Sequence, residues 1–437
     1  MGISYEDAVK AKKAVRKKLL EDPNVVSIAV VTETNELGEP TGDYAVQVGV
    51  ASMNAYTHAQ KRGQSAIPAE FLLPSEGKSK DQLIHFHVVK EGKIEALTTY
   101  TPSEKDVPSA MDDDLPETTD KLTVNYTLRR RPSLCGQSIG HPSITVGTLG
   151  MLLEYSEGPN VGKAFLLSNN HVLAANNLAS LGDDITQPGK HDSGLVGQDT
   201  IAHLYRWVPL SASGFNYVDC AIAEVKGGHN WSRYVSPHIT HIGVPEDPIN
   251  PAVGTFVEKV GRTTGRTQGE IVSTDVDINI DYPMGRLKFI DQIRTTNMSR
   301  GGDSGSCLIK KGTRKPIGLL FAGSNAASYY NPLPDVLSSL SKAHAYQYPS
   351  GVRYQFSSDH PLRVLQRRSY SGLASSLRAI PRGVGATVVV ACLGILTRLG
   401  NLEPPTRPAN MLSFFKPAPP CSKPNTYDPP SKVGIQR

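Results

Sequence analysis

Residues 301 to 309, GGDSGSCLI, place a serine on a glycine-rich turn directly before an apolar run. A serine hydroxyl becomes a good nucleophile only when a base takes its proton, and the oxyanion that its attack creates needs backbone N–H donors. Glycines let the chain turn so that such amides point outward, and the run from Cys307 predicts a buried strand behind the turn. Ser304 is therefore a candidate nucleophile, although an ordinary Gly/Asp/Ser turn before a strand has the same composition.

A catalytic serine requires an imidazole base and a carboxylate that orients the imidazole. His171, in AFLLSNNHVLA, follows an apolar strand-like run at the start of a turn. Asp219, in NYVDCAIAEV, leads into another apolar run, where a carboxylate without a partner is costly to bury. Each has an ordinary alternative: a hydrogen-bonded histidine at a strand end, and a turn aspartate that faces water. All three together, in this order along the chain, match one of the three known orders of the Ser-His-Asp triad.

The segments that carry these residues resemble a known family. The stretches SIGHPSITVGTLGMLLEY, AFLLSNNHVLA, YVDCAIAEV, VGRTTGRTQGEI, GGDSGSCLI and IGLLFAGS, within residues 138 to 340, resemble the trypsin-like (chymotrypsin-fold) serine peptidases related to the plant narrow-leaf regulators and bacterial trypsin-like peptidases. PNVVSIAVV near the start is similar to the N-terminal domain of that group. The resemblance implies that His171 is the general base, that Asp219 orients it and that Ser304 attacks the scissile carbonyl.

The same resemblance implies a substrate site. The N–H groups of Gly302 and Ser304 would form the oxyanion hole, and an uncharged pocket would favour an apolar or small residue on the acyl side of the cut. Asp303 would be structural, and no Ile-Val-Gly-Gly start follows a cleavable basic residue. We therefore expect a constitutive enzyme, or one gated by oligomerisation or a partner. The predicted pocket consists of Met298 and of four residues that would pair with the substrate backbone: Phe321, Ala322, Gly323 and Ser324.

Composition divides the chain into four segments. Residues 1 to 100 predict a small α+β domain, in which Ser4 caps a helix and strand-like runs begin at Val25, Asp43 and Leu83. Residues 101 to 137 hold an acidic run and a basic run between prolines, which indicates a linker. Residues 138 to 345 alternate short strand-like runs with turn residues, as in a sandwich or barrel. Residues 346 to 437 predict a basic, Pro-rich, disordered tail. The predicted fold is mainly β, a chymotrypsin-like double β-barrel behind the α+β domain.

Charge and cysteine content indicate which partners and which cellular location to expect. The net charge is +5, but residues from 353 onward carry +9 and the rest −4, so no nucleic-acid partner is expected for the body of the protein. Residues 383 to 397 are uncharged but too few for a stable membrane span. Five cysteines without a C-x-x-C pair, and a charged N-terminus, predict a cytoplasmic protein. The expected partner is a protein or peptide substrate, and the sequence is compatible with a homo-oligomer.

These patterns predict a serine endopeptidase that cleaves proteins through an acyl-enzyme, without a metal or a cofactor. The alternative is a protease fold used as a scaffold or regulator, which binds partner proteins with little or no proteolysis. A third candidate is another serine hydrolase, such as an esterase, with the same triad.

Overall fold

The computed structural model describes residues 2–35, 37, 39–74, 81–97, 124–341 and 361–366. The fold is mainly β with few helices, as predicted. The chain divides into two units, residues 1–367 and residues 368–437, and the second unit lies outside the described residues. So do residues 101–123 of the predicted linker and all of the predicted tail except residues 361–366.

The N-terminal segment is an α+β unit whose sheet continues into the rest of the protein. The Ser4 hydroxyl accepts a hydrogen bond from the Asp7 amide at 3.1 Å and caps α1, as the sequence predicts. The strand order is β1-β2-β4-β3, and only the β2–β4 pair is parallel. The elements are α1 (Tyr5–Glu21), β1 (Val25–Thr34), β2 (Pro40–Val50), α2 (Met53–Lys61), β3 (Glu70–Leu73), β4 (Gln82–Lys90) and β5 (Glu95–Ala96).

A six-stranded sheet forms the centre of the next region, in the order β11-β12-β14-β10-β9-β22. Its large apolar core is formed by consecutive buried runs such as residues 164 to 167. The elements are β6 (Ser133–Cys135), β7 (Ser138–Ile139), β8 (Gly147–Thr148), β9 (Met151–Tyr155), β10 (Phe165–Ser168), α3 (Asn170–Leu173), η1 (Ala175–Asn177), β11 (Asp184–Thr186), η2 (Lys190–Asp192), β12 (Thr200–Trp207), β14 (Ala221–Val225), η3 (Gly228–Arg233), β15 (Val235–Ile239) and β22 (Leu362–Val364).

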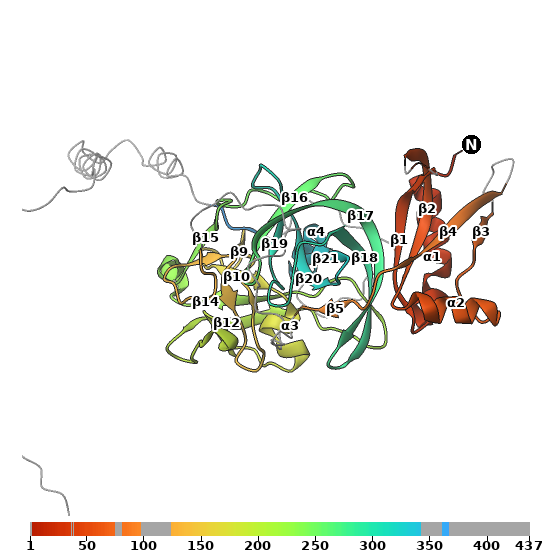
Figure 1. Cartoon of the computed structure of the whole chain (residues 1–437). Coiled ribbons are helices and arrows are strands. Elements are labelled where there is room, and N and C mark those ends of the chain that lie inside the picture. The colour runs from red at the N-terminus through yellow and green to blue at the C-terminus, as the bar shows by residue number, and fades with distance from the viewer. Residues whose placement is uncertain are drawn as a thin grey trace, which may run out of the picture. The chain divides into compact units, whose positions relative to one another are not determined.

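Six further strands close on themselves, because β17 pairs with β18 as well as with β16. The ring runs β16-β17-β18-β21-β20-β19, and Figure 1 shows the long strands β17 and β18 curving around β20 and β21. The elements are β13 (Phe215–Asn216), β16 (Phe256–Gly261), β17 (Gly265–Tyr282), β18 (Gly285–Thr296), β19 (Cys307–Lys310), β20 (Pro316–Gly323), β21 (Ala327–Pro332) and α4 (Leu333–Ser341).

The packed region extends past the predicted boundaries of 138 and 345. Strand β6 begins at Ser133 and pairs with β15, and β22 adds a strand to β9, with Leu362 opposite Tyr155. Both are three-residue strands at sheet edges. Composition does not reveal such strands, because their stability comes from the sheet that receives them.

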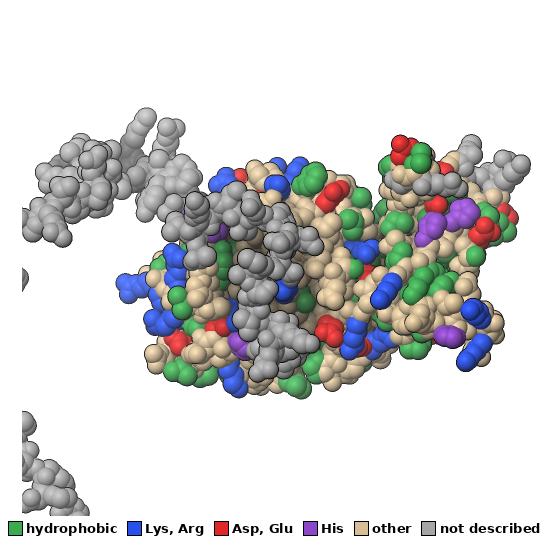
Figure 2. Space-filling model, in the orientation of Figure 1, with side chains coloured by type: hydrophobic (Ala, Val, Ile, Leu, Met, Phe, Trp, Pro, Cys, Tyr) green, Lys and Arg blue, Asp and Glu red, His purple; other side chains and the backbone are tan. Residues whose placement is uncertain are grey.

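The surface is mixed in charge. On the face drawn in Figure 2, basic and acidic side chains are interspersed over the described part of the protein. Among the described residues, no helix is both long and apolar enough to cross a membrane.

A buried lysine ties α1 to the second ring of strands. Strand β1 pairs with β17, with Ser27 opposite Ile278, and beside this pair the Lys12 ammonium lies 2.8 Å from Asp275 and 2.9 Å from Asp277. Burial lowers the pKa of Lys12, but the surrounding carboxylates outweigh burial and raise it overall. Burial raises the pKa of Asp291, 3.9 Å from the ammonium, to about 6. The three carboxylates are close enough together to hold a metal ion, but the ammonium lies among them.

We predict that Lys12→Met lowers the free energy of unfolding by about 3–5 kcal/mol, because it leaves buried carboxylates without a counter-charge. Lys13→Met makes the same substitution at an exposed position of the same helix and should change stability by less than about 0.5 kcal/mol. Urea unfolding followed by circular dichroism measures both. Equal stability of the two variants would show that the buried network does not join the segments.

Candidate active site

The Ser304 turn has the geometry that its glycines suggest. Gly302 and Gly305, on either side of Asp303 and Ser304, both have φ +92°, a conformation that side-chain-bearing residues rarely adopt. The Ser304 carbonyl accepts a hydrogen bond from the Thr148 amide at 2.7 Å, and the Gly305 amide donates to Leu320 at 2.8 Å. The turn leads into β19, whose first three residues are buried. The strand predicted behind the serine is confirmed.

The pairing of β10 with β14 brings His171 and Asp219 together. Ser168, at the end of β10, lies opposite Ala221, at the start of β14. His171 comes three residues after Ser168, on α3, and Asp219 comes two residues before Ala221. The His171 Nδ1 atom is hydrogen-bonded to Asp219 Oδ2, and the His171 amide donates to Asp219 Oδ1 at 3.3 Å. The pair that the sequence suggested is therefore formed.

The second ring of strands also holds Asp219. Tyr282, at the end of β17, donates its hydroxyl to Asp219 Oδ2 at 2.6 Å, and the Asp219 amide donates to Asn331 Oδ1, on β21, at 3.0 Å. Burial, and then the negative charge of Asp219, raise the pKa of Tyr282 well above its usual range. Sequence reasoning missed both residues. A tyrosine at the end of a strand carries no local signal that distinguishes it from an ordinary core residue.

Strand β8 lies against the segments that carry the serine and the histidine. Besides the Thr148 bond to Ser304, a Cβ atom on Gly147 would lie 2.5 Å from Val172, next to the histidine. His171, Asp219 and Ser304 all have 0% exposure. His171 Nε2 and Ser304 Oγ have no hydrogen-bond partner among the described residues, so the histidine–serine bond is not formed here. Such bonds are often long before substrate binds and tighten only in the complex.

Asp303 is held by an internal cation. Lys259 Nζ lies 3.0 Å from Asp303 Oδ2, and neither side chain is exposed. The amides of Thr263 and Thr264 donate to Asp303 Oδ1 at 2.8 and 3.1 Å. Burial lowers the pKa of Lys259, and the charge of Asp303 opposes this effect. The lysine gives the aspartate a positive partner without any cleavage of the chain, in keeping with the structural role expected of Asp303.

The predicted pocket residues lie around the end of β20. Phe321 and Ala322 are buried, Gly323 ends the strand and Ser324 is half-buried. Met298 belongs to the apolar core of the second ring, and its sulfur lies 2.9 Å from the position that a Cβ atom on Gly269 would take. Its amide donates to Ser328 Oγ at 3.0 Å, and Ser299 Oγ lies 2.7 Å from that hydroxyl.

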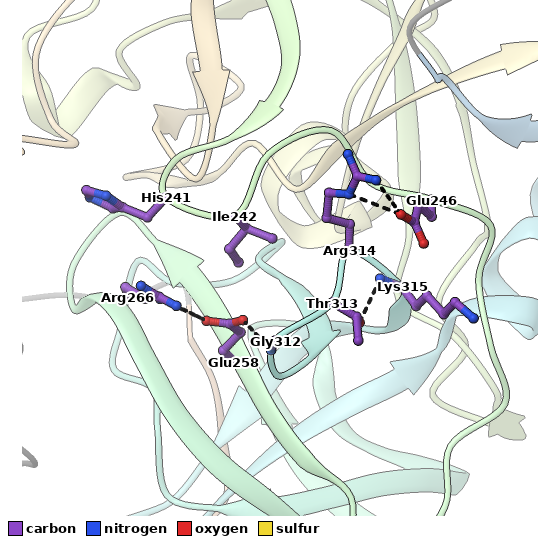
Figure 3. Close-up of a pocket in the computed structure, with 9 residues that line it drawn as sticks. All are labelled: His241, Ile242, Glu246, Glu258, Arg266, Gly312, Thr313, Arg314 and Lys315. Atoms are coloured by element: carbon purple, nitrogen blue, oxygen red, sulfur yellow. Dashed lines mark hydrogen bonds and ion pairs between the residues drawn. The ribbon is translucent and has the colours of Figure 1, made fainter.

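Another part of the chain fills this site. Strand β5 pairs with the end of β20, and the Gly302 amide, predicted to lie in the oxyanion hole, donates to the Leu97 carbonyl at 2.7 Å. Figure 1 shows β5 running beside β20. Two hollows of the described surface lie elsewhere. One, of about 500 Å³, is shown in Figure 3, where Arg266 pairs with Glu258 and Arg314 pairs with Glu246. The other, of about 630 Å³, lies beside His203 and Tyr205. Neither is lined by a predicted site residue.

Comparisons with known proteins add a set of solved serine proteases. No protein-family model and no curated protein matches the chain. A glutamic-acid-specific serine protease is 18% identical, with a TM-score of 0.33 over 47% of this chain and 96% of that one. Thermobifida fusca Protease A is 17% identical, with a TM-score of 0.33 over 47% and 94%. The MamO protease domain of Magnetospirillum magneticum is 10% identical, with a TM-score of 0.28 over 47% and 96%.

These matches are trypsin-like serine proteases, but the similarity is weak and covers less than half of this chain. None of them supports the narrower resemblance to the plant narrow-leaf group. The chemistry of the site is therefore argued from its own geometry. A histidine oriented by a buried carboxylate, together with a buried serine on a glycine turn, is suited to acyl transfer.

We predict that Gly150→Ala destabilises the protein by about 1–3 kcal/mol, because overpacking forces the backbone to shift. A Cβ atom on Gly150 would lie 2.2 Å from the carbonyl oxygen of Gly305, on the serine turn. Gly214→Ala is the control, because the nearest contact of a Cβ atom there is the Ser211 hydroxyl at 3.8 Å. Denaturant unfolding compares the two. If Gly150→Ala unfolds at the same denaturant concentration as Gly214→Ala, the serine turn does not pack closely against Gly150.

Proposed function

We propose that the protein is a serine endopeptidase with a chymotrypsin-like double β-barrel, which cuts protein or peptide chains through an acyl-enzyme. The observation that carries the proposal is the buried His171–Asp219 pair, held from the second ring by Tyr282. Burying an ionised carboxylate costs free energy. The proposal gives this buried carboxylate a use, because it orients the imidazole that acts as the base for Ser304. The narrow-leaf relationship stays a prediction.

In the proposed reaction, Asp219 fixes the proton of His171 on Nδ1 and leaves Nε2 as the base. His171 takes the Ser304 proton as Oγ attacks the carbonyl carbon, and later gives that proton to the leaving amine. The amides of Gly302 and Ser304 receive the developing negative charge. Acyl transfer by these groups requires neither a metal nor a cofactor.

The arrangement of strands supports the two-barrel proposal. His171 and Asp219 flank strands of the first sheet, and Ser304 precedes a strand of the second, closed one, which is the division of a triad between two barrels that the proposal requires. Barrel cores supply rigid supports, and short loops between strands supply the chemistry. The edge at the end of β20 accepts an added strand, as its pairing with β5 illustrates, and such an edge favours an extended peptide. A small ester would not use this edge.

We further propose an intracellular location. Cys135, Cys220 and Cys307 are buried and free, and burial raises the pKa of their thiols. Free cysteines suit a reducing compartment.

One observation favours a scaffold or regulator as the second candidate. The triad is covered, and the Ser304–His171 hydrogen bond is not formed. A protein of this kind would keep the fold and the covered site but would not react at Ser304.

We predict that a fluorophosphonate probe labels the folded protein on Ser304, because a serine activated by a histidine reacts with such electrophiles. Digestion and mass spectrometry locate the label. Heat-denatured protein and Ser304→Ala should remain unlabelled. Labelling of Ser304→Ala at the wild-type level would refute the assignment of the nucleophile.

We predict that Tyr282→Phe lowers kcat about tenfold and leaves KM unchanged, because it removes a hydrogen bond to the carboxylate and no contact with substrate. Tyr155→Phe, the same substitution in the first barrel away from the site, should keep full kcat. Peptide turnover measures both, and thermal unfolding shows whether each variant folds. A KM change without a kcat change would mean that Tyr282 acts on substrate binding instead of positioning the triad.

A further inference from the structure

Strand β5 lies on the sheet edge where a peptide substrate is expected. It pairs antiparallel with β20, with Ala96 opposite Ala322 and Glu95 opposite Gly323. Phe321, Ala322, Gly323 and Ser324 are the residues that the sequence analysis assigned to substrate pairing. On its other side, Glu95 lies opposite Asp281 of β17. Residues 95 to 97 therefore occupy the substrate edge as an additional strand.

Leu97 continues this strand to the Ser304 turn. Its amide faces the Phe321 carbonyl at 3.4 Å, and its carbonyl oxygen accepts a hydrogen bond from the Gly302 amide at 2.7 Å. Gly302 supplies one of the two proposed oxyanion-hole donors. The carbonyl of Leu97 thus makes the contact that a reacting carbonyl must make, in the same turn that carries the nucleophile.

The side chain of Leu97 is bound as well. It packs, partly buried, against the apolar core cluster that contains Met298. Its Cδ2 atom lies 3.3 Å from the position that a Cβ atom on Gly323 would take, so glycine leaves the room that the leucine uses. A leucine in this place agrees with the apolar preference expected from Met298.

The reacting atoms are buried and unpaired. Ser304 Oγ and His171 Nε2 have no hydrogen-bond partner among the described residues, and neither residue is exposed. Buried polar atoms usually have a partner. Ser304 lies two residues after Gly302, whose amide already binds the Leu97 carbonyl, so two orphaned atoms on the nucleophile and its base fit a site poised before attack.

We propose that Ser304 cuts its own chain after Leu97, which makes the segment of residues 95 to 97 the first substrate of the site. The inference rests on the proposed endopeptidase function and adds its preferred substrate. The residue on the acyl side of the cut is leucine or a similar apolar residue, and the first cut is intramolecular. The same segment excludes other substrates until it leaves.

The reaction balances without an external oxidant or metal. Ser304 Oγ forms a bond with the Leu97 carbonyl carbon while His171 Nε2 takes the hydroxyl proton. The bond from that carbon to the nitrogen of Thr98 then breaks, and His171 returns the proton to this nitrogen. Water, deprotonated by His171, cleaves the Leu97 ester and restores Ser304. The products are a chain that ends in the Leu97 carboxylate and a chain that begins with the amino group of Thr98.

The test compares purified full-length wild type with Ser304→Ala on a denaturing gel, followed by intact mass measurement and N-terminal sequencing. Wild type should yield a fragment that begins at Thr98, and Ser304→Ala should stay whole. The two fragments should co-elute in native gel filtration, because β1 remains paired with β17. The first-order rate of cleavage should be independent of dilution. A rate that falls with dilution would overturn the intramolecular assignment.

Leu97→Asp is the matched variant, because it places a charge against the apolar cluster without touching the triad. It should slow cleavage after residue 97 about tenfold or more and keep fluorophosphonate labelling of Ser304. Leu72→Asp, at an exposed leucine of β3 with 57% exposure, should cut itself at the wild-type rate. Thermal unfolding of both variants shows that they fold.

Labelling separates failure of this inference from failure of the proposed function. Wild type that labels at Ser304 and cuts added peptides but stays whole would overturn self-cleavage and leave the endopeptidase intact. If Leu97→Asp then cuts added peptides faster than wild type, the segment is an inhibitor and not a substrate. Protein that neither labels nor cuts, in wild type and in Leu97→Asp alike, would overturn both.

Discussion

The carboxylate of Asp219 is the point on which this structure depends. It is fully buried, and it accepts hydrogen bonds from His171 on α3 and from Tyr282 at the end of β17. Its backbone amide donates to Asn331 on β21. A buried charge is tolerated only where donors surround it. The segments that carry His171, Tyr282 and Asn331 must therefore meet in one arrangement for the charge to be satisfied.

Two buried lysines hold the serine turn and the N-terminal segment in place. Lys259 holds Asp303 and with it the turn that carries Ser304. Lys12 holds three aspartates on β17 and β18 and so anchors the N-terminal segment. That anchoring bears on the site, because the same segment leads into β5 and Leu97. The N-terminal segment is thus attached at both ends. At one end it is held by the β1–β17 pair and the buried Lys12 ammonium, and at the other by the Leu97 carbonyl, which accepts a hydrogen bond from the Gly302 amide.

Local patterns in the sequence were sufficient for part of this picture. The Ser4 cap, the strand-like runs from Val25 and Asp43, and the strand behind Ser304 each depend on a few neighbouring residues, and all four are confirmed. His171 and Asp219 could be chosen because each is a polar residue beside an apolar strand. Their actual partnership depends on the pairing of β10 with β14, which a family resemblance implied but a local pattern does not encode.

The remaining features depend on contacts across the whole fold. Tyr282 lies 63 residues from Asp219 in the sequence, and Lys12 lies 263 residues from Asp275, so no periodicity connects them. Leu97 was assigned to the end of a separate domain, because a two-residue strand has no pattern of its own and is stable only on the edge that receives it. The strand β22 went unrecognised for the same reason.

The tautomer of His171 tests most directly whether Asp219 prepares a base. Long-range ¹H–¹⁵N NMR of protein labelled on histidine, with His171→Gln to assign the signal, reports which ring nitrogen carries the proton at neutral pH. The account predicts a proton on Nδ1 and a bare Nε2, with loss of this preference in Asp219→Asn. A proton on Nε2 in the wild type would contradict it, because the nitrogen that must accept the serine proton would already be occupied.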